Sequence, residues 1–568
     1  MPLFRGKKRR TIVMTGPVAP KDPTEKRPGF YVLLDKQVGG TPQDDGRGRH
    51  SIYISSDRLP SFAQVTGGIK DPAILELLTG VAGFRKLVHS IGVSISAQDP
   101  TMEVGFSLIC KGNGGPGSCH RFTFPADGAE RVITLDKLDW SEFDAGLGEF
   151  RFEFPSVADM ATASVKCYVN DGFQIPEVDP DPAVDTEGYR YREMIARSFL
   201  SAGNNARVQS FLRRARAGEE VTVAFLGGSI TQGAGAVPLQ ENCYARVCWE
   251  GLRRKYGTNI RYIKAGVGGT PSETGLMRYD RDITRDGSVQ PDLVVVEFAV
   301  NDAGDETEGV FYESLVRHIL SGPGHPAVIL LFAVFADDWN LKRRLAPIGY
   351  RHQLPMVDVL EAVSPQFGDP ENRVITKRQY FYDVYHPSNL GHKIMADCLL
   401  YCLDRLDHQQ PEEEPEGHVL PYYGGDYQAL RLTDRKNPFP GAVVSPGSFT
   451  ETDTDLQSVP LDDDDHNTPM FPHNWKKGRG NYPFVLELEC RRLVLEFKDS
   501  GSQEFGKALV TIDGEKRRIL DPTEAGWTHC HATVLFNKQS TAKHRIEISM
   551  TPGDEGKTFT ILGFGVVK

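Results

Sequence analysis

The central part of the chain alternates continuous apolar runs with helical stretches, and this alternation limits the fold more than any other feature. Residues Leu293–Val300 read LVVVEFAV, which suits a strand covered on both faces of a sheet. Strands that alternate with helices are typical of parallel βαβ units. We therefore predict that residues 188–408 form an α/β domain with a parallel sheet. The other expected strands are Val221–Leu226, Arg261–Ala265, Ala327–Phe335 and Leu354–Val359, and the expected helices lie near Tyr189–Arg216, Asn242–Tyr256, Ser272–Thr284, Gly309–Leu320 and Asn389–Leu406.

The two flanking segments are strand-like. Residues 1–187 contain eight short runs rich in Val, Ile, Phe and Tyr, separated by Gly, Pro and Asp, and this pattern predicts a β-sandwich. Residues 418–568 contain six similar runs, which predict a second β-sandwich. The acidic, proline-bearing stretches Pro176–Asp185 and Gln409–Gly417 are interpreted as the linkers between these segments.

Composition and charge narrow the class of protein. Of the 568 residues, 39% are hydrophobic and 25% are charged, as in ordinary globular proteins. The formal net charge is −11, whereas polyanion-binding proteins usually carry a basic excess, so nucleic acid is not an expected partner. No run reaches the roughly 18 apolar residues of a membrane span. The basic N-terminus lacks the apolar core of a secretory signal, so we expect a cytoplasmic protein, or a secreted one whose leader was removed.

The nine cysteines include no CxxC pair, and their number is odd. We expect reduced thiols, which fits a cytoplasmic protein. A disulfide between Cys110 and Cys119 is the alternative.

A glycine-flanked serine follows the first predicted strand of the central segment. Gly227-Gly228-Ser229-Ile230-Thr231 comes directly after Val221–Leu226. Ligands of α/β sheets bind beyond the carboxyl ends of the strands, which is where this serine falls. The sequence matches neither a P-loop, which needs GK[ST], nor the G-x-S-x-G elbow of α/β-hydrolases. Ser229 is therefore a candidate nucleophile, and an incidental serine in a glycine-rich turn is the alternative.

An Asp–His pair lies near the end of the same segment. A serine nucleophile needs a base to accept its proton, and the base needs an orienting partner. Asp383 and His386 are three residues apart and precede the helix expected from Asn389. They are candidates for these two roles, and a surface ion pair is the alternative. His318, His325 and His352 have no Asp three residues before them, and His392 falls within the expected helix.

Two further loops could stabilise an oxyanion. Asn301 follows the strand Leu293–Val300, where its amide could donate a hydrogen bond. The sequence Ala265-Gly266-Val267-Gly268-Gly269-Thr270 follows another strand, and a backbone N–H group there could point at the same oxyanion. An Asx turn and a flexible loop are the respective alternatives.

These four blocks, in this order, resemble the four sequence blocks of the SGNH hydrolases, also called the GDSL family. GGSIT resembles the serine block, AGVGGTPSETGLMR the glycine block, FAVND the G-x-N-D block, and DVYHPSNLGH the D-x-x-H block. The resemblance covers about residues 218–406. It implies that Ser229, Asp383 and His386 are catalytic and that Ser229, Gly269 and Asn301 form the oxyanion hole, with Gly268 as the substitute for Gly269. The first block reads G-G-S rather than G-D-S, and the third reads A-V-N-D rather than G-x-N-D.

The resemblance implies an α/β/α fold and acyl transfer from an ester through an acyl-enzyme, without a metal or an organic cofactor. SGNH domains joined to β-sandwiches resemble bacterial carbohydrate esterases that deacetylate plant polysaccharides, and in that setting the C-terminal segment looks jelly-roll-like. The expected substrate is therefore an acetylated oligo- or polysaccharide. A lipid or thioester hydrolase and a glycan-binding protein with an idle hydrolase domain are the alternatives.

Several residues are candidates for contacts with a substrate or an ion. Trp339 follows the strand Ala327–Phe335 and is predicted to lie near Ser229, while Trp475 in a C-terminal loop could stack on a sugar or cap a core. The run Asp462–Asp465 could hold Ca²⁺ or be a solvated loop. The long irregular stretch Tyr422–Pro483 carries several aromatic residues, and we expect it to pack across the central domain.

Overall fold

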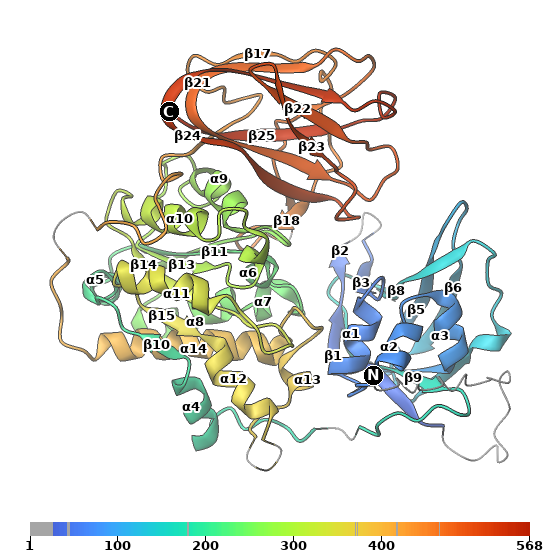
Figure 1. Cartoon of the computed structure of the whole chain (residues 1–568). Helices are drawn as coiled ribbons and strands as arrows, with labels where there is room; N and C mark the ends of the chain where they lie inside the picture. The colour runs from blue at the N-terminus through green and yellow to red at the C-terminus, as the bar shows by residue number, and fades with distance from the viewer. Residues whose placement is uncertain are drawn as a thin grey trace, which may run out of the picture. The chain divides into compact units, whose positions relative to one another are not determined.

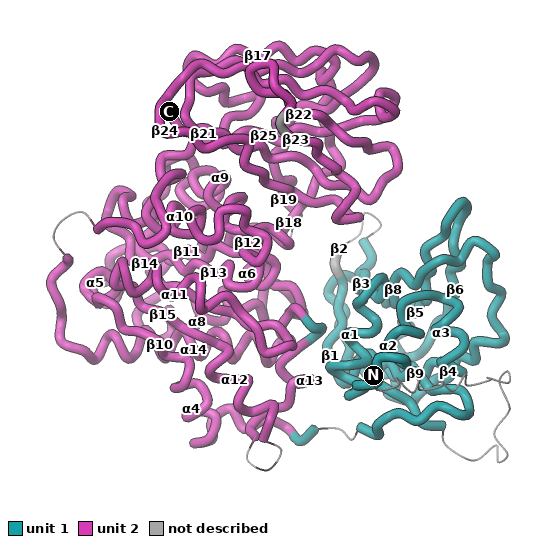
Figure 2. The backbone as a smooth tube through the Cα atoms, viewed as in Figure 1, with its two compact units in different colours: residues 1–182, 382–384 teal, residues 183–381, 385–568 magenta. Residues whose placement is uncertain are grey.

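A computed structural model of the chain (Figure 1) describes residues 27–42, 46–178, 181–369, 371, 373–415, 419–464 and 466–568. The chain divides into two compact units (Figure 2). Unit 1 comprises Met1–Pro182 and Tyr382–Val384, and unit 2 comprises Ala183–Phe381 and Tyr385–Lys568. Within the described residues, every helix is too short or too polar to cross a lipid bilayer.

Unit 1 contains two antiparallel sheets, as predicted for a sandwich. Their strand orders are β1-β9-β4-β7 and β2-β3-β8-β5-β6. Both sheets contribute to one apolar core, which includes Phe30, Val93, Phe106 and Phe152. The strands are β1 Gly29–Gly39, β2 Thr41–Pro42, β3 Gly48–Tyr53, β4 Val88–Ser96, β5 Glu103–Gly112, β6 Cys119–Pro125, β7 Arg131–Thr134, β8 Asp144–Phe154 and β9 Met160–Val169.

Three short helices of unit 1 were not predicted. They are α1 Arg58–Val65, α2 Pro72–Leu77 and α3 Val81–Leu87. Helix α1 buries Leu59, Phe62 and Ala63, a spacing of three and four residues that places them on one helix face. The expectation of an entirely β segment is therefore wrong for residues 58–87.

All nine cysteines of the chain are free thiols.

The central sheet of unit 2 has the order β10-β15-β14-β13-β11-β12. The pairs β11–β12, β11–β13, β13–β14 and β14–β15 are parallel, as predicted, and only β10 runs antiparallel to its neighbour. Strand β10 interrupts the helix predicted over Tyr189–Arg216, because Phe199 and Ser201 pair with β15 at the sheet edge. The strands are β10 Phe199–Ser201, β11 Val221–Gly227, β12 Ile260–Gly266, β13 Leu293–Glu297, β14 Ala327–Phe332 and β15 Met356–Asp358.

Helices cover both faces of this sheet, which gives the three layers implied by the resemblance (Figure 1). One face packs against α9 Ser272–Asp282, α10 Val310–Leu320 and α11 Lys342–Arg351, whose apolar residues share a core with Val294, Val296 and Leu330. The other helices of the domain are α4 Tyr189–Ala196, α5 Ala206–Arg216, α6 Ser229–Gln232, α7 Leu239–Asn242, α8 Tyr244–Tyr256, α12 Val359–Phe367, α13 Lys377–Tyr380 and α14 Asn389–Asp407.

The C-terminal strands form one continuous hydrogen-bonded sheet around a core of their own. Its main path is β16-β25-β21-β24-β22-β23, with β17 beside β21 and β20 beside β25. The predicted strands Phe484–Glu489 and Arg492–Phe497 merge into β21, and the predicted strands His531–Phe536 and His544–Ser549 merge into β24. The register of β21 shifts between Cys490 and Arg492. The strands are β16 Arg431–Thr433, β17 Val443–Ser445, β20 Trp475–Lys476, β21 Phe484–Asp499, β22 Ala508–Ile512, β23 Glu515–Leu520, β24 His529–Met550 and β25 Thr560–Val567, with β18 Ser458–Pro460 paired to β19 Asn467–Pro469.

The C-terminal segment joins the central domain in one compact unit because the two share a core. Val494, Cys530 and Leu562 belong to the same buried cluster as the residues of α9 and α10. The stretch Tyr422–Pro483 packs on the central domain, as expected. Within it, the ring of Tyr427 stacks on Phe311 with the centroids 3.9 Å apart. The sequence predicted three domains, and the second and third form a single compact unit.

Candidate active site

Three loops that carry predicted site residues follow neighbouring parallel strands of the central sheet. Ser229 is the first residue of α6 and follows β11, while Gly268 and Gly269 follow β12. Asn301 begins a short 3₁₀ helix, Asn301–Gly304, a few residues after β13. Because the carboxyl ends of parallel strands meet at one edge of a sheet, these loops face the same region.

His386 reaches Ser229. Its Nε2 atom lies 2.9 Å from Ser229 Oγ, which is hydrogen-bonding distance for a nucleophile and its base. Both side chains are half-buried. Because Nε2 faces the serine, Nδ1 is the nitrogen that a carboxylate would orient.

Asp383 is buried, with 4% of its surface exposed. It belongs to unit 1, where Nη1 of Arg58 donates to its Oδ2 at 3.5 Å. The neighbouring Tyr382 hydrogen-bonds to His50 at 3.1 Å in the same unit. The role of Asp383 as the partner of His386 stays a prediction.

His392 has a structural role, because both nitrogens of its ring are held by backbone groups. Its Nδ1 atom accepts a hydrogen bond from the backbone N–H of Tyr244 at 3.2 Å, and its Nε2 lies 3.0 Å from the carbonyl of Ala234. Complete burial lowers the pKa of His392 to about 3, so this ring stays neutral at physiological pH.

The hydrogen bonds of the glycine loop distinguish Gly269 from Gly268. The N–H of Gly268 already donates to Oε1 of Gln232 at 3.0 Å. Within the described residues, the N–H groups of Gly269 and Ser229 have no acceptor, and the side chain of Asn301 makes no hydrogen bond. Gly269 is also exposed. The free donors at this edge are therefore those of Ser229, Gly269 and Asn301, the three predicted for the oxyanion hole.

The structure explains why glycine replaces aspartate in the first block. A Cβ atom on Gly228 would lie 2.1 Å from Oδ1 of Asn301 and 2.9 Å from its Nδ2. A side chain at this position would therefore displace the amide of Asn301.

A buried carboxyl group supports the nucleophile turn. Thr231 Oγ1 donates to Oε2 of Glu297 at 3.0 Å, and Tyr244 OH lies 2.8 Å from the same hydroxyl. Glu297 is fully buried at the end of β13, and burial raises its pKa to about 8. This residue holds the turn that presents Ser229.

The raised pKa of Glu297 makes the stability of the fold depend on pH. An acid whose pKa is higher in the folded state contributes stability below its unfolded pKa, near 4.5, and this contribution is lost as the pH rises through about 8. We expect Glu297→Gln to remove this loss, because the amide oxygen still accepts from Thr231. The free energy of unfolding of the variant relative to the wild type should therefore increase from about pH 5 to about pH 8, by up to about 1.4 kcal/mol per pH unit, and level off above pH 8. Melting temperatures measured across this pH range follow the change.

The exposed Glu489 provides the matched control for this experiment. Glu489→Gln should show the pH dependence of the wild type. If Glu297→Gln also follows the wild type at every pH, Glu297 is ionised in the folded protein and the assignment is wrong.

This part of the chain is similar to a known family of proteins. Residues 225–394 match the sequence model of the GDSL-like lipase/acylhydrolase family. These residues form a GDSL-like hydrolase domain. The resemblance is thereby confirmed, and the chain is a carboxylic ester hydrolase. We refer to residues 225–394 as the hydrolase domain. A search of curated proteins finds no match.

Solved structures extend the likeness beyond the hydrolase domain. A two-domain esterase active on acetylated mannans is 25% identical, with a TM-score of 0.57 over 66% of this chain and 99% of that chain. A structure of such an esterase co-crystallized with mannopentaose has 25% identity and a TM-score of 0.56, over 66% of this chain and 98% of that chain. The likeness therefore spans a larger share of this chain than the hydrolase domain alone.

Four residues near the glycine loop were not predicted as site residues. Gln232 lies in the hydrolase domain, whereas Gln457, Trp527 and His529 come from the C-terminal segment. Trp527 is 46% exposed, and its ring lies 2.9 Å from the position of a Cβ on Gly269. The sequence GWTHCH contains two of these residues, but a local pattern does not show which strand ends meet the hydrolase domain.

The predicted substrate-binding tryptophans differ in their surroundings. Trp475 is 5% exposed and packs in the C-terminal core against Phe484 and Phe564, with centroids 5.2 and 6.2 Å apart, so its prediction as a substrate residue is wrong. Trp339 is half-buried and stacks on Phe335 at 6.1 Å, and Phe335 in turn contacts Tyr385, the neighbour of His386. A role of Trp339 in substrate binding stays a prediction.

The acidic run after β18 pairs with basic side chains. Asp462 contacts Arg285, and Asp463 Oδ2 lies 3.0 Å from Nη1 of Arg246. Asp465 lies outside the described residues. No group of three or more His, Cys, Asp or Glu able to hold a metal ion occurs in the described part of the chain.

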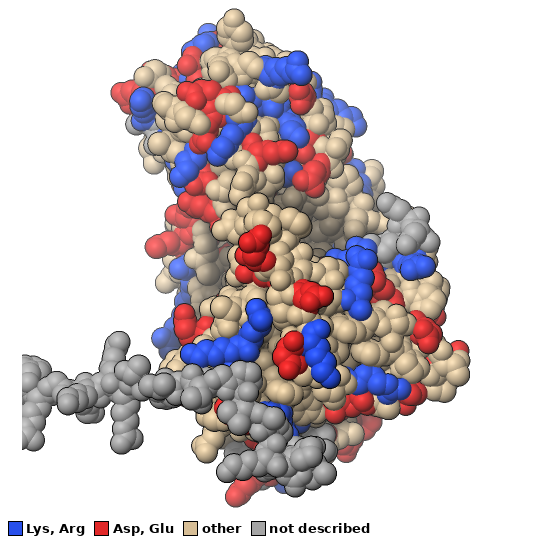
Figure 3. Space-filling view, turned by 90° about the vertical axis from the view of Figure 1, so that its right-hand side faces the viewer, with Lys and Arg blue, Asp and Glu red and all other residues tan. Residues whose placement is uncertain are grey.

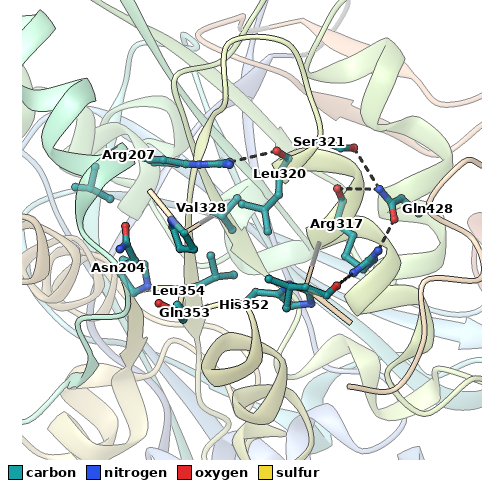
Figure 4. A pocket seen from close by; sticks show the side chains of 15 residues that line it. Asn204, Arg207, Arg317, Leu320, Ser321, Val328, His352, Gln353, Leu354 and Gln428 are labelled. Atoms are coloured by element: carbon teal, nitrogen blue, oxygen red, sulfur yellow. Dashed lines mark hydrogen bonds between the residues drawn. The ribbon is translucent and has the colours of Figure 1, made fainter. Parts of the chain in front are cut away.

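A cavity of about 280 Å³ lies elsewhere in unit 2 (Figure 4). Ala327 and Pro355 line it at the amino ends of β14 and β15, which is the opposite edge of the sheet from Ser229. Its charged groups are occupied: Arg207 donates to the carbonyls of Leu320 and Pro326, and Arg317 donates to Gln428. The bond between Arg317 and Gln428 joins the C-terminal segment to the hydrolase domain.

Proposed function

We propose that this protein is a carbohydrate acetylesterase that removes O-acetyl groups from a plant-type polysaccharide or its oligosaccharides. The observation that carries the proposal is the 2.9 Å contact between Ser229 Oγ and His386 Nε2, beside unused hydrogen-bond donors. This arrangement lies in a GDSL-like hydrolase domain, in a chain similar to an esterase active on acetylated mannans.

Acylation starts at Ser229. His386 Nε2 accepts the hydroxyl proton as Oγ attacks the carbonyl carbon of the acetyl ester, and Asp383 orients the resulting imidazolium through Nδ1. The carbonyl oxygen becomes an oxyanion that accepts hydrogen bonds from the N–H groups of Ser229 and Gly269 and from the amide of Asn301. When the tetrahedral intermediate collapses, His386 returns the proton to the sugar oxygen, and the sugar leaves.

Deacylation repeats these steps with water as the nucleophile. His386 takes a proton from the water molecule as its oxygen attacks the acetyl-Ser229 carbonyl. Collapse of the second tetrahedral intermediate releases acetate and returns the proton to Ser229 Oγ. Each of the proposed roles is carried by a side chain or an N–H group of the chain itself.

Two surface features support a glycan as the leaving group. The exposed ring of Trp527 beside Gly269 offers an aromatic platform on which a sugar could stack. Among the coloured residues of the face in Figure 3, Lys and Arg side chains are interspersed with Asp and Glu. Such a mixed surface suits a neutral glycan better than a polyanion.

Acyl-chain selectivity tests this proposal against a lipid or thioester hydrolase. We expect activity on acetylated manno-oligosaccharides and on p-nitrophenyl acetate to exceed activity on p-nitrophenyl octanoate by at least about 100-fold, since each additional methylene without a pocket weakens transition-state binding. Acetate release and nitrophenol absorbance measure the two reactions. A preference for the octanoyl ester would contradict the carbohydrate assignment.

A further inference from the structure

The peptide group between Gly268 and Gly269 has an unusual environment. A trans peptide is planar, and its C=O and N–H bonds point in opposite directions. The N–H of this peptide is that of Gly269, which has no acceptor among the described residues. Whatever holds the carbonyl of Gly268 therefore sets the direction of the N–H group assigned to the oxyanion hole.

Gln457 of the C-terminal segment holds that carbonyl. Its Nε2 donates to the carbonyl oxygen of Gly268 at 2.7 Å, across 189 residues of sequence. Its Oε1 accepts from the backbone N–H of Cys530 at 3.0 Å, and its own carbonyl accepts from Met470 at 2.8 Å. The side chain is 9% exposed. Because both ends of the amide are bonded and the backbone is fixed, Gln457 keeps one orientation.

His529 holds the next peptide of the loop. Its Nε2 lies 3.0 Å from the carbonyl oxygen of Gly269, and its Nδ1 lies 2.9 Å from Oδ2 of Asp499. Asp499 is 1% exposed, so the ring is anchored on a buried carboxylate.

The conformation of the loop depends on these contacts. Gly269 has φ +73°, a left-handed conformation that glycine tolerates and other residues rarely adopt. A Cβ at this position would lie 2.9 Å from both His529 Nε2 and Trp527 Cζ2, so the C-terminal segment packs directly on the loop backbone. On the opposite side, Gln232 Oε1 accepts from the N–H of Gly268. The peptides before and after the Gly268–Gly269 peptide are thus held by hydrogen bonds as well.

We propose that Gln457 and His529 are positioning residues that aim the N–H of Gly269 at the oxyanion. Neither residue has a bond to Ser229 or His386 among the described residues. They act through the backbone of the loop, and the C-terminal segment thereby completes the oxyanion hole of the hydrolase domain. The inference rests on the proposed function, because it assigns the Gly269 N–H to an acyl-transfer intermediate.

Gln457→Glu tests the first of these contacts. Glutamate keeps the shape and the acceptor for Cys530, but as a carboxylate it cannot donate to Gly268. A hydrogen bond made only in the transition state affects kcat and kcat/KM equally, and so we expect both to fall by about 10–100-fold on p-nitrophenyl acetate, with KM nearly unchanged. This small ester avoids any effect on glycan binding. Gln457→Met, which keeps the volume without a charge, provides the second variant.

Gln428→Glu is the matched control. Gln428 also comes from the C-terminal segment and bonds to the hydrolase domain, where its Nε2 donates to the carbonyl of Arg317 and to Ser321. It lies at the cavity on the opposite edge of the sheet (Figure 4). We expect this variant to keep the kcat of the wild type. The melting temperature of each variant shows whether it is folded.

His529→Asn and His531→Asn test the second contact. His531 Nδ1 lies 3.0 Å from the same Asp499 oxygen, but His531 makes no bond to the glycine loop among the described residues. We expect kcat to fall about 10-fold or more for His529→Asn and to stay within about twofold for His531→Asn.

The outcomes separate this inference from the proposed function. If Ser229→Ala is inactive while folded Gln457→Glu, Gln457→Met and His529→Asn all keep the wild-type kcat, the inference is wrong and the proposed function stands. A change confined to KM would also contradict it. If Ser229→Ala remains active, the proposed function itself is wrong. A loss of kcat in the Gln457 and His529 variants, with both controls unaffected, supports the inference.

Discussion

Replacing Ser229 with alanine is expected to abolish ester hydrolysis, lowering kcat by about 10⁵–10⁶-fold. Removal of the nucleophile from a serine–histidine site leaves only the catalysis supplied by the oxyanion hole and by binding. Ser229 is a half-buried residue at the start of α6, and alanine fits the same helical position without a clash. The fold should therefore remain intact. Hydrolysis of p-nitrophenyl acetate and the melting temperature measure the two effects.

Ser288→Ala is a suitable control for this variant. Ser288 lies on the surface of the hydrolase domain, where its hydroxyl donates to the carbonyl of Arg285. It should keep the activity of the wild type. Near-normal turnover by Ser229→Ala would mean that another residue is the nucleophile.

A chain ending at Asp407 is expected to be insoluble or to lose activity by about 100-fold or more. The truncation removes Gln457 and His529, which hold the glycine loop. Misplacing an oxyanion donor lowers the catalytic rate about as much as removing it. It also exposes apolar residues of α9 and α10, among them Phe311, which is covered by Tyr427. Exposed apolar surface of this kind promotes aggregation.

Expression of this shortened chain beside the full chain provides the measurement. Its soluble fraction and its activity on p-nitrophenyl acetate are compared with those of the wild type. A soluble protein with full activity would show that the C-terminal segment is an independent appendage. Reduced activity on acetylated oligosaccharides alone would assign the segment to glycan binding and not to the oxyanion hole.

The parallel sheet and the serine block could be predicted because their signals are local. Strands covered on both faces are apolar at every position, as in Leu293–Val300, and the polar or glycine-rich loop after each strand falls at one sheet edge. That rule predicts that Ser229, Asn301 and the loop Ala265–Thr270 lie at one edge of the sheet, and in the structure they follow the neighbouring strands β11, β13 and β12. The short edge strand β10 has only three residues, too few for a distinct pattern.

The rest of the site depends on contacts that are distant in sequence. Gln457 and His529 meet the glycine loop across 189 and 260 residues, and no periodicity in the sequence reports such a meeting. Trp475 was predicted to contact the substrate but is buried. An aromatic residue between predicted strands has the same local sequence pattern whether it is exposed or buried. In β21, the charged residues Arg491 and Arg492 interrupt the apolar pattern, so one long strand was predicted as two.

The covalent intermediate offers the most direct test of the central claim, that Ser229 carries the acetyl group of a carbohydrate ester during turnover. The full chain is mixed with an acetylated manno-oligosaccharide and quenched in acid within the first turnover, and peptide mapping by mass spectrometry locates the modification. We predict a mass increase of one acetyl group on the peptide that contains Ser229, and none in the Ser229→Ala protein. Release of acetate from the oligosaccharide by Ser229→Ala at the wild-type rate, or an acetyl group on a different residue, would contradict the account.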